Sequence, residues 1–508
     1  MLGFIREAGD LRHLLAVMVI VGLLPLTVAA KTPTEGMSLI EAVKVGHQDR
    51  VASLLEDGVD VNAQAGDGST ALLWAAHRDE LSIAELLLEF GADVNVANEL
   101  GATPLWAASV NGNVEIVRRL IHAGADPNAS LLKGETVLMA ASRTGSSALT
   151  ALLLEAGANP DARGPRGQTA LMWAAAQRHA DVVAELVAGG ADVQLRSDAW
   201  PLLMAQPPAP HPDHQREFTI GGNSALMFAA RSGAYEAAKL LAEAGADVNA
   251  VAGSGITALT MAVYSDFGTL IADTGWRDGG PFRLDGGREH PGRFGELAAF
   301  LLQQGADPNL GAGEFTALHA AILRRNEEMV AILVEHGADP NLPVGGWTPL
   351  QRVSNTDYYI HKAWVGAPPI WLAARFGTPE ILGRLAAAGA DVDVVHRGEF
   401  HGGGEGGDRA PLLVEVTTPL MAAVGMSRTG REWVLIPDQE VREQEMLEKA
   451  HVLVCMGADA DFVDDQGQSA LDGARAGEVQ SLIEFLVLDS PQCMTEEEDL
   501  LSPDGGRN

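Results

Sequence analysis

The chain has 508 residues, and its 68 acidic side chains outnumber 35 basic ones to give a formal net charge of −33 at pH 7. A charge of this sign repels phosphates, which argues against a nucleic-acid partner. With 47% hydrophobic and 20% charged residues, the composition is that of a globular protein. Two cysteines are too few for a disulfide framework or a four-thiolate zinc site.

Residues 1–30 have the layout of a secretory signal peptide. Arg6 and Arg12 precede an apolar run from Leu14 to Val28, and small residues lead up to Ala30. The run is shorter than the roughly 20 residues of a spanning helix, so an uncleaved anchor is the weaker alternative. We therefore expect cleavage after Ala30, a periplasmic or secreted mature protein, and no membrane span after cleavage.

A five-residue pattern close to Gly-Ala-Asp-x-Asn recurs through the rest of the chain. Its copies begin at Gly58, Gly91, Gly124, Gly157, Gly190, Gly245, Gly305, Gly337, Gly389 and Gly457. The first five copies are spaced 33 residues apart. A second pattern, such as Thr103-Pro-Leu-Trp-Ala-Ala, lies midway between them and also starts at Thr70, Thr136, Thr169, Ser224 and Thr316. This self-similarity indicates an array of structural repeats.

The period and both patterns resemble those of ankyrin repeats, whose signature is Thr-Pro-Leu-His-x-Ala-Ala. The resemblance covers nearly all of residues 38–488. It implies an all-α solenoid in which each repeat is a helix-turn-helix followed by a β-turn finger. One such unit cannot bury its own apolar face, so adjacent copies must stack. We count about eleven repeats, the last of them incomplete.

Each part of the repeat pattern has a physical reason. Thr103 can cap a helix, and Pro104 suits the first helical position because its missing N–H costs nothing there. The paired alanines allow neighbouring inner helices to approach closely. The glycine of each pentad can take the left-handed conformation that ends the outer helix. The Asp and Asn that follow can hydrogen-bond nearby backbone groups and shape the turn.

We expect one array over residues 31–490 and an acidic tail over 491–508. Residues 38–194 form regular repeats, 195–461 form repeats with insertions, and 462–488 form a C-terminal cap. The insertions lie near residues 200–212, 264–293, 347–366, 396–416 and 428–437. The first of these reads as a Pro-rich loop without a helix or strand of its own. Long loops on a rigid scaffold often carry function.

The insertions contain aromatic residues that the repeat pattern does not require. These either anchor a partner or tether the loops to the solenoid, and the sequence favours neither. They are Trp200, Phe218, Phe267, Trp276, Phe282, Trp347, Tyr358, Tyr359, Trp364, Phe400 and Trp433. In contrast, Trp74, Trp173 and Phe228 share one repeat position that the resemblance implies is buried, so we expect them in the core.

The resemblance also implies that a partner docks on the concave face, which inner-helix ends and fingertips form. The candidate partner-binding residues there are His77, Arg78, Asn111, Arg143, Thr144, Arg166, Gln177, Arg231, Arg324, Arg375 and Phe376. Arginine recurs among them although the chain is acidic overall. Such a basic stripe would favour a protein partner with an acidic segment. The alternative is that arginine is common at this repeat position whatever the function.

Two clusters have residue types that could bind a metal. One contains His211, His214 and Glu217, and the other runs from His396 to His401 with Glu399, Glu405 and Asp408. A zinc site needs several ligands on rigid elements with supporting contacts, and loops rich in Pro or Gly supply neither. We therefore expect solvated loops, with no catalytic residue, metal or cofactor. Asp273-Thr-Gly lacks the second copy that an aspartic protease requires.

The two cysteines leave two possibilities. Cys455 lies in an apolar helix end, where a buried inert thiol is the default. In an oxidising compartment it could instead pair with Cys493 and fix the tail, which the sequence alone cannot decide.

The leading hypothesis is an exported, non-catalytic scaffold for protein–protein interaction. It would bind a partner through the concave face and the insertion loops. One alternative is a metal-dependent hydrolase built around His211, His214, His396 and His401. A second alternative is a host-directed effector.

Overall fold

A computed structural model gives the fold and describes residues 38–203, 217–265, 293–311, 315–346, 362–401, 412–426 and 438–487. The predicted signal peptide, the predicted acidic tail and most insertion residues lie outside this part of the chain. The described residues form two compact units. Unit 1 comprises residues 38–200, 219–265 and 293–305, and unit 2 comprises the described residues from 306 to 487 with 201–203 and 217–218.

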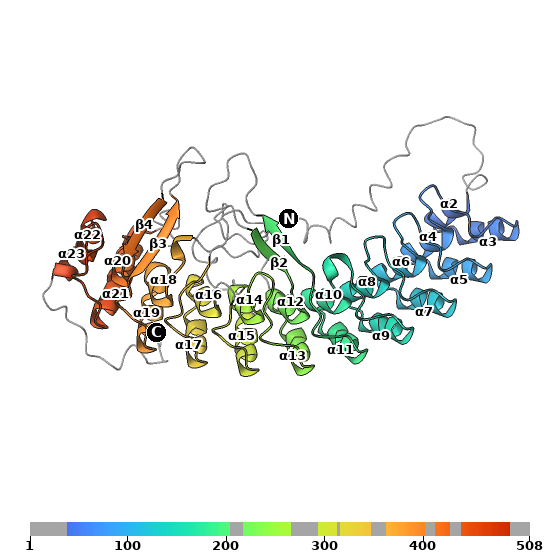
Figure 1. The fold of residues 1–508 in the computed structure, drawn as a ribbon. Helices are drawn as coiled ribbons and strands as arrows, with labels where there is room; N and C mark the ends of the chain where they lie inside the picture. The colour runs from blue at the N-terminus through green and yellow to red at the C-terminus, as the bar shows by residue number, and fades with distance from the viewer. Residues whose placement is uncertain are drawn as a thin grey trace, which may run out of the picture. The chain divides into compact units, whose positions relative to one another are not determined.

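Unit 1 contains seven pairs of antiparallel helices, each with an inner and an outer member (Figure 1). The inner helices are α2 (Leu39–Lys44), α4 (Ala71–His77), α6 (Pro104–Asn111), α8 (Val137–Thr144), α10 (Ala170–Ala176), α12 (Ala225–Ser232) and α14 (Ala258–Ser265). The outer helices are α3 (Gln48–Glu56), α5 (Leu81–Glu89), α7 (Val114–His122), α9 (Ser147–Glu155), α11 (Ala180–Ala188), α13 (Tyr235–Glu243) and α15 (Phe294–Gln303).

Unit 2 repeats the same arrangement in four pairs. Its inner helices are α16 (Ala317–Leu323), α18 (Pro369–Phe376), α20 (Pro419–Ala423) and α22 (Ala470–Ala476). Its outer helices are α17 (Glu327–Glu335), α19 (Pro379–Ala387), α21 (Gln439–Cys455) and α23 (Gln480–Val487). The described residues thus hold eleven helix pairs, which confirms the predicted all-α solenoid and its repeat number. Short 3₁₀ turns occur at η1 (Pro165–Gly167) and η3 (Lys362–Trp364).

The inner helices begin as the sequence predicts. The hydroxyl of Thr103 accepts a hydrogen bond from the Trp106 N–H at 3.2 Å, and Pro104 occupies the first helical turn. Thr70, Thr136 and Thr169 make the same contact three residues ahead. The paired alanines that follow, such as Ala75 and Ala76, are completely buried. Small side chains at this point let successive inner helices pack directly on one another.

The ends of the outer helices and the turns beyond them also match the prediction. Gly91, Gly124 and Gly157 have φ angles of 83°, 89° and 93°, in the left-handed region. The pentad asparagine additionally links neighbouring repeats. Asn128 donates from Nδ2 to the carbonyl of Gly157 at 3.0 Å and accepts from the Asn159 N–H at 2.8 Å. Each asparagine of this kind therefore bridges two successive turns.

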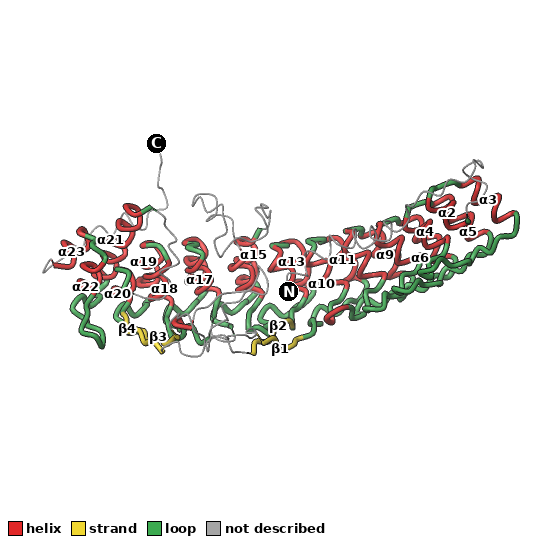
Figure 2. The backbone as a smooth tube through the Cα atoms, turned by 90° about the horizontal axis from the view of Figure 1, so that it is seen from above, coloured by secondary structure: helices red, strands yellow, loops and turns green. Residues whose placement is uncertain are grey.

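Two insertions form β-hairpins, which the sequence analysis did not predict. Strands β1 (Ala199–Leu203) and β2 (Glu217–Gly221) pair in one sheet, and β3 (His396–His401) pairs antiparallel with β4 (Leu412–Thr417) in another. The expectation of a loop without a strand after Trp200 was therefore wrong. The strands lie along the edge of the helix layers that carries the fingers (Figure 2).

Among the described residues, no helix combines the length and the apolar character that crossing a bilayer requires. The shortest inner helix, α20, has five residues and the longest outer helix, α21, has 17.

Candidate functional site

The candidate site in unit 1 is a row of side chains at the C-terminal ends of α4, α6, α8, α10 and α12. We call it the inner-helix row and define it as His77, Arg78, Asn111, Arg143, Thr144, Gln177 and Arg231. These five helices pack in sequence order, so equivalent positions lie side by side. Arg78, Asn111, Thr144 and Gln177 are exposed, whereas His77, Arg143 and Arg231 are half-buried. The structure therefore brings these predicted residues together on one face.

Aromatic rings beneath the row carry cations on their faces. The Lys44 ammonium lies 4.3 Å from the Trp74 ring centroid, and the Arg143 guanidinium lies 5.6 Å from that of Trp173. Arg231 lies 4.9 Å from the Phe228 centroid. Phe228 is buried, as predicted, but Trp74 and Trp173 are only half-buried. These two indoles reach the edge of the layer, where a cation covers part of each ring.

Arg143 is also engaged by a carboxylate of its own repeat. Its Nη1 lies 3.1 Å from Oε1 of Glu135, and the two side chains are 19% and 12% exposed. Burial raises the pKa of Glu135, and the nearby guanidinium of Arg143 only partly opposes this effect. Glu135 therefore largely compensates the positive charge of Arg143 within the protein. This weakens the hypothesis of a continuous basic stripe.

Two further members of the row make contacts within the repeat frame. Asn111 donates from Nδ2 to the carbonyl of His77 at 2.6 Å, which connects α6 to the end of α4. The Thr144 hydroxyl donates to the Ala141 carbonyl at 2.7 Å. Burial, followed by the adjacent Arg78, lowers the pKa of His77, so this imidazole is neutral near pH 7. Gln177 and Arg78 remain as exposed polar groups at the surface.

The fingertips next to the inner-helix row carry a cation–aromatic pair and two exposed leucines. The guanidinium of Arg166 lies 5.0 Å from the Trp200 centroid, at the base of the β1–β2 hairpin. Leu132 and Leu100 are 78% and 56% exposed, and the Leu132 N–H donates to the Leu100 carbonyl at 3.0 Å. The sequence analysis did not include either leucine among the candidate partner-binding residues. The Leu131-Leu132 pair directly before Lys133 and Gly134 was the available signal.

In unit 2 the predicted site residues behave differently. Arg324 is half-buried at the end of α16. Phe376 is 5% exposed and packs on Trp364 with the ring centroids 4.9 Å apart, so its assignment to an exposed surface was wrong. The insertion residue Trp364 covers a position that other repeats expose. Burial lowers the pKa of Arg375, and Glu415 opposes this shift. Arg375 thus belongs to the interior more than to a docking surface.

His396 is a core residue and not part of a solvated loop. It is 2% exposed in β3, its Nε2 lies 2.7 Å from the Ala363 carbonyl, and its ring lies 4.6 Å from the Trp371 ring centroid. Burial lowers its pKa, although backbone hydrogen bonds oppose the shift. Within the described residues, no group of three or more potential ligands could hold a metal ion. His211, His214 and the side chain of His401 lie outside that description.

Two insertion aromatics within the described residues support the alternative that they tether the insertions to the solenoid. Trp364 and Phe400 are 5% and 9% exposed, so they attach their insertions to the repeats. Phe267, Trp276, Phe282, Trp347, Tyr358, Tyr359 and Trp433 lie outside the described residues, as does Asp273. Cys455 is disulfide-bonded, which corrects the expectation of an inert thiol. Cys493, the only other cysteine of the chain, is not among the described residues.

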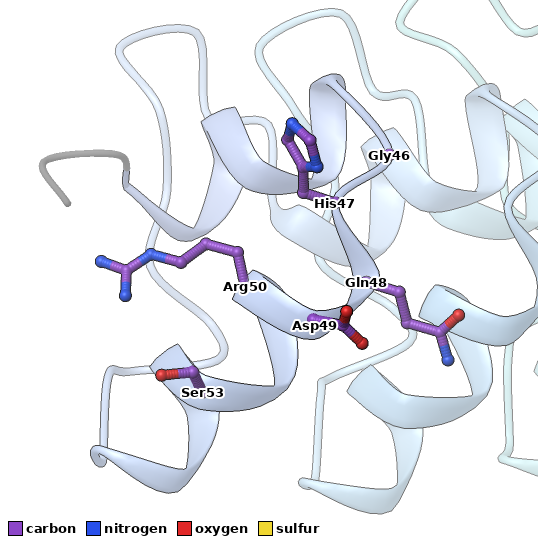
Figure 3. A pocket seen from close by; sticks show the side chains of 6 residues that line it. All are labelled: Gly46, His47, Gln48, Asp49, Arg50 and Ser53. Atoms are coloured by element: carbon purple, nitrogen blue, oxygen red, sulfur yellow. The ribbon is translucent and has the colours of Figure 1, made fainter. Parts of the chain in front are cut away.

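A shallow depression lies at the first helix pair. Gly46, His47, Gln48, Asp49, Arg50 and Ser53 line it, around the turn between α2 and the start of α3. Figure 3 shows the side chains of Arg50 and Ser53 extending to one side, whereas those of His47 and Gln48 extend in other directions. Catalysis requires groups that converge on a reacting atom, and these side chains do not converge. The depression therefore gives no support for a catalytic site.

Comparison with known protein families agrees with the fold and the repeat pattern. A family model described as ankyrin repeats (3 copies) matches residues 39–131, 128–197 and 291–362. A second one, described as ankyrin repeats (many copies), matches residues 218–271. Together these matches cover more than half of the 508 residues. The chain belongs to the ankyrin repeat family.

Proposed function

We propose that this protein is an exported scaffold that binds a partner protein through the inner-helix row and the neighbouring fingertips of unit 1, without catalysis of its own. Ankyrin repeats generally serve as protein–protein interaction modules. The observation that carries the proposal is the alignment of equivalent helix ends over five successive repeats. It places exposed polar groups beside half-buried aromatic rings on one face.

Such a face has the composition of a binding surface. Tryptophan and arginine supply much of the energy in protein interfaces, and polar groups around them supply orientation. The capping threonines and the asparagine bridges hold the helices in place before a partner binds. The entropy cost of ordering this surface on binding is therefore small. Exposed Leu100 and Leu132 add an apolar contact at the fingertips.

The partner segment we favour is acidic. Arg78 in the row and Lys133 on a fingertip are exposed cations, and the cations over Trp74 and Phe228 add positive potential on the same face. A carboxylate-rich segment would meet complementary charge there, in contrast to the acidic remainder of the chain. Neutralising Arg78 and Lys133 together should weaken binding and reduce its dependence on salt concentration.

Site-specific photo-crosslinking in the native cell tests the proposal. A crosslinker at Gln177 should capture a defined partner, whereas one at Glu243 on the outer helix α13 should not, although its side chain is 55% exposed. The captured protein is identified by mass spectrometry and its binding measured with purified components. Equal capture from both positions, or none from Gln177, would contradict binding at the inner-helix row.

The proposal of export rests on the predicted signal peptide and on the disulfide at Cys455. A disulfide at Cys455 is consistent with an oxidising compartment, because cytosolic thiols are kept reduced. N-terminal sequencing of the mature protein should begin at Lys31. An intact N-terminus at Met1 in a membrane fraction would instead favour the uncleaved anchor.

The metal-dependent hydrolase lacks a supporting observation among the described residues. One of its four proposed ligands, His396, has a packing role that explains it fully. Metal analysis of the purified protein decides the question for the others. Stoichiometric zinc that is lost on substitution of His211 and His214 would overturn the non-catalytic proposal.

A further inference from the structure

Helix α21 is unusual among the outer helices of unit 2. It has 17 residues, whereas α17 and α19 have nine each and α23 has eight. Its C-terminal end has the normal relation to the pentad at Gly457, as α19 has to Gly389. The extra two turns therefore lie at its N-terminal end, over residues 439–446. The core of a single repeat does not require them.

These extra turns reach a repeat that is not a neighbour in the array. Glu445 forms a bidentate pair with Arg325, with Nη1–Oε1 at 3.0 Å and Nη2–Oε2 at 2.5 Å. Arg325 lies in the turn between α16 and α17, two repeats before α21. The same guanidinium donates to the carbonyl of Phe376 at 3.3 Å, at the end of α18. One side chain thus contacts both of the following repeats.

The contact is shielded from solvent. The side chains of Arg325 and Glu445 are each 14% exposed. On the next turn of α21, Lys449 lies 2.7 Å from Glu445 and is 5% exposed as a residue. Parallel bonds between a guanidinium and a carboxylate fix both groups in one orientation. Because they are partly buried, losing one partner would leave the other charge uncompensated.

Arg325 itself is held in an uncommon backbone conformation. Its φ angle is 54°, in the left-handed region that non-glycine residues rarely adopt. Other inner-to-outer turns use this conformation at the equivalent residue, as at Asp79 and Arg178. The repeat frame therefore fixes the turn from which the Arg325 side chain reaches Glu445, two repeats further along the chain.

We infer that the N-terminal extension of α21 is a strap that joins three successive repeats, α16/α17, α18/α19 and α20/α21, into one cooperative block through the Arg325–Glu445 pair. Repeat arrays normally gain stability only from contacts between nearest neighbours, so that local opening can occur repeat by repeat. The strap adds a contact between first and third repeats. Opening of α17 and opening of the N-terminal turns of α21 become linked as a consequence.

Hydrogen exchange of the full chain tests this inference in a double-mutant cycle. Arg325→Met and Glu445→Met should each accelerate exchange in both α17 and the N-terminal half of α21, by roughly tenfold or more. The double variant should be no faster than the faster single variant, because the pair is already broken. Glu448→Gln is the matched control, since Glu448 is exposed on the same helix, and it should leave α17 unchanged.

Additive effects of the two substitutions, or acceleration confined to the helix that carries the substitution, would overturn the strap. If the methionine variants do not fold, Arg325→Lys and Glu445→Gln serve the same cycle with smaller changes. Both keep a polar group of similar length at the site. Linked exchange of α17 and α21 in either milder variant supports the inference, and unlinked exchange contradicts it.

Discussion

Arg143 and Glu135 form an ion pair at 3.1 Å in which both side chains are mostly buried, yet burial still raises the pKa of the carboxyl group. The desolvation of Glu135 therefore outweighs the attraction of Arg143 for its ionised form. A buried pair of this kind contributes little net stability, but removing Arg143 alone would leave the desolvated carboxylate of Glu135 without its counter-ion. The two partners should consequently respond unequally to substitution.

We predict that Arg143→Met lowers the free energy of unfolding by about 2–4 kcal/mol, because it leaves Glu135 buried without its partner. Glu135→Gln should cost no more than about 1 kcal/mol, because it removes the buried carboxylate charge while the guanidinium of Arg143 keeps its contact with the Trp173 ring. Urea denaturation of both variants measures the difference. Equal losses would mean that the ion pair itself stabilises unit 1. Any binding test that changes Arg143 needs this stability measurement as its control.

The contribution of the asparagine bridges to stability can be tested with two opposite substitutions in this chain. Asn128 donates to Gly157 and accepts from Asn159, whereas Asp161, at the equivalent position one repeat later, only accepts from the Asp192 N–H at 2.8 Å. Asn128→Asp should therefore cost about 0.5–1.5 kcal/mol, and Asp161→Asn should gain a similar amount by adding a donor toward Gly190. Equilibrium unfolding of the two single variants, each against the parent protein, checks the opposite signs.

The regular features of the fold could be predicted because they depend on local chemistry. The hydroxyl of Thr103 and the left-handed glycine at Gly124 act within a few residues of their place in the sequence. The spacing of 33 residues then fixed which elements stack. For the same reason, the predicted members of the inner-helix row in unit 1 do lie on one face.

The insertions could not be predicted because tertiary contacts decide their structure. The Pro-rich segment after Trp200 indicates a loop, but Gly221 packs directly on Asp198 and Trp200, and this close approach supports a hairpin. Phe376 occupies a position that the repeat pattern exposes, and only the distant Trp364 covers it. His396 likewise became a core residue through Trp371. None of these partners follows from the period of the repeat.

Buried histidines should make unit 2 sensitive to acid. His319 is 0% exposed, and burial lowers its pKa to about 4 from 6.5. The unfolded chain therefore binds a proton more readily than the folded protein as the pH falls below 6.5. The stability that the neutral imidazole provides is complete above pH 6.5 and declines by roughly 3 kcal/mol on approach to pH 4.

His319→Met is the informative variant, because methionine stands at the equivalent position in the repeats of Met139 and Met172. Its unfolding free energy should fall less steeply between pH 6.5 and pH 4.5 than that of the parent protein. His396 is a second buried imidazole and will retain part of the acid effect. Identical pH profiles for variant and parent would show that His319 is not the titrating group.

Lys449 gives a pH dependence of the same sign, but in an alkaline range. Burial lowers its pKa to about 8 from 10.5, and Glu445 on the same helix opposes the shift, while Arg325 and Arg375 from the two preceding repeats add to it. Because the folded pKa is the lower one, the unfolded chain holds the proton more strongly between pH 8 and 10.5. The contribution of this residue to stability therefore rises with pH across that window, by roughly 3 kcal/mol in total.

Lys449→Met should consequently be neutral or stabilising at pH 7, by up to about 3 kcal/mol, since it removes a buried cation whose charge is opposed by the nearby Arg325 and Arg375. The advantage of the variant should shrink as the pH approaches 10. Thermal and urea unfolding at pH 7, 8.5 and 10 measures this difference. A variant that is less stable than the parent at pH 7 would mean that the charge of Lys449 reinforces the Arg325–Glu445 pair, in which case the strap depends on all three side chains.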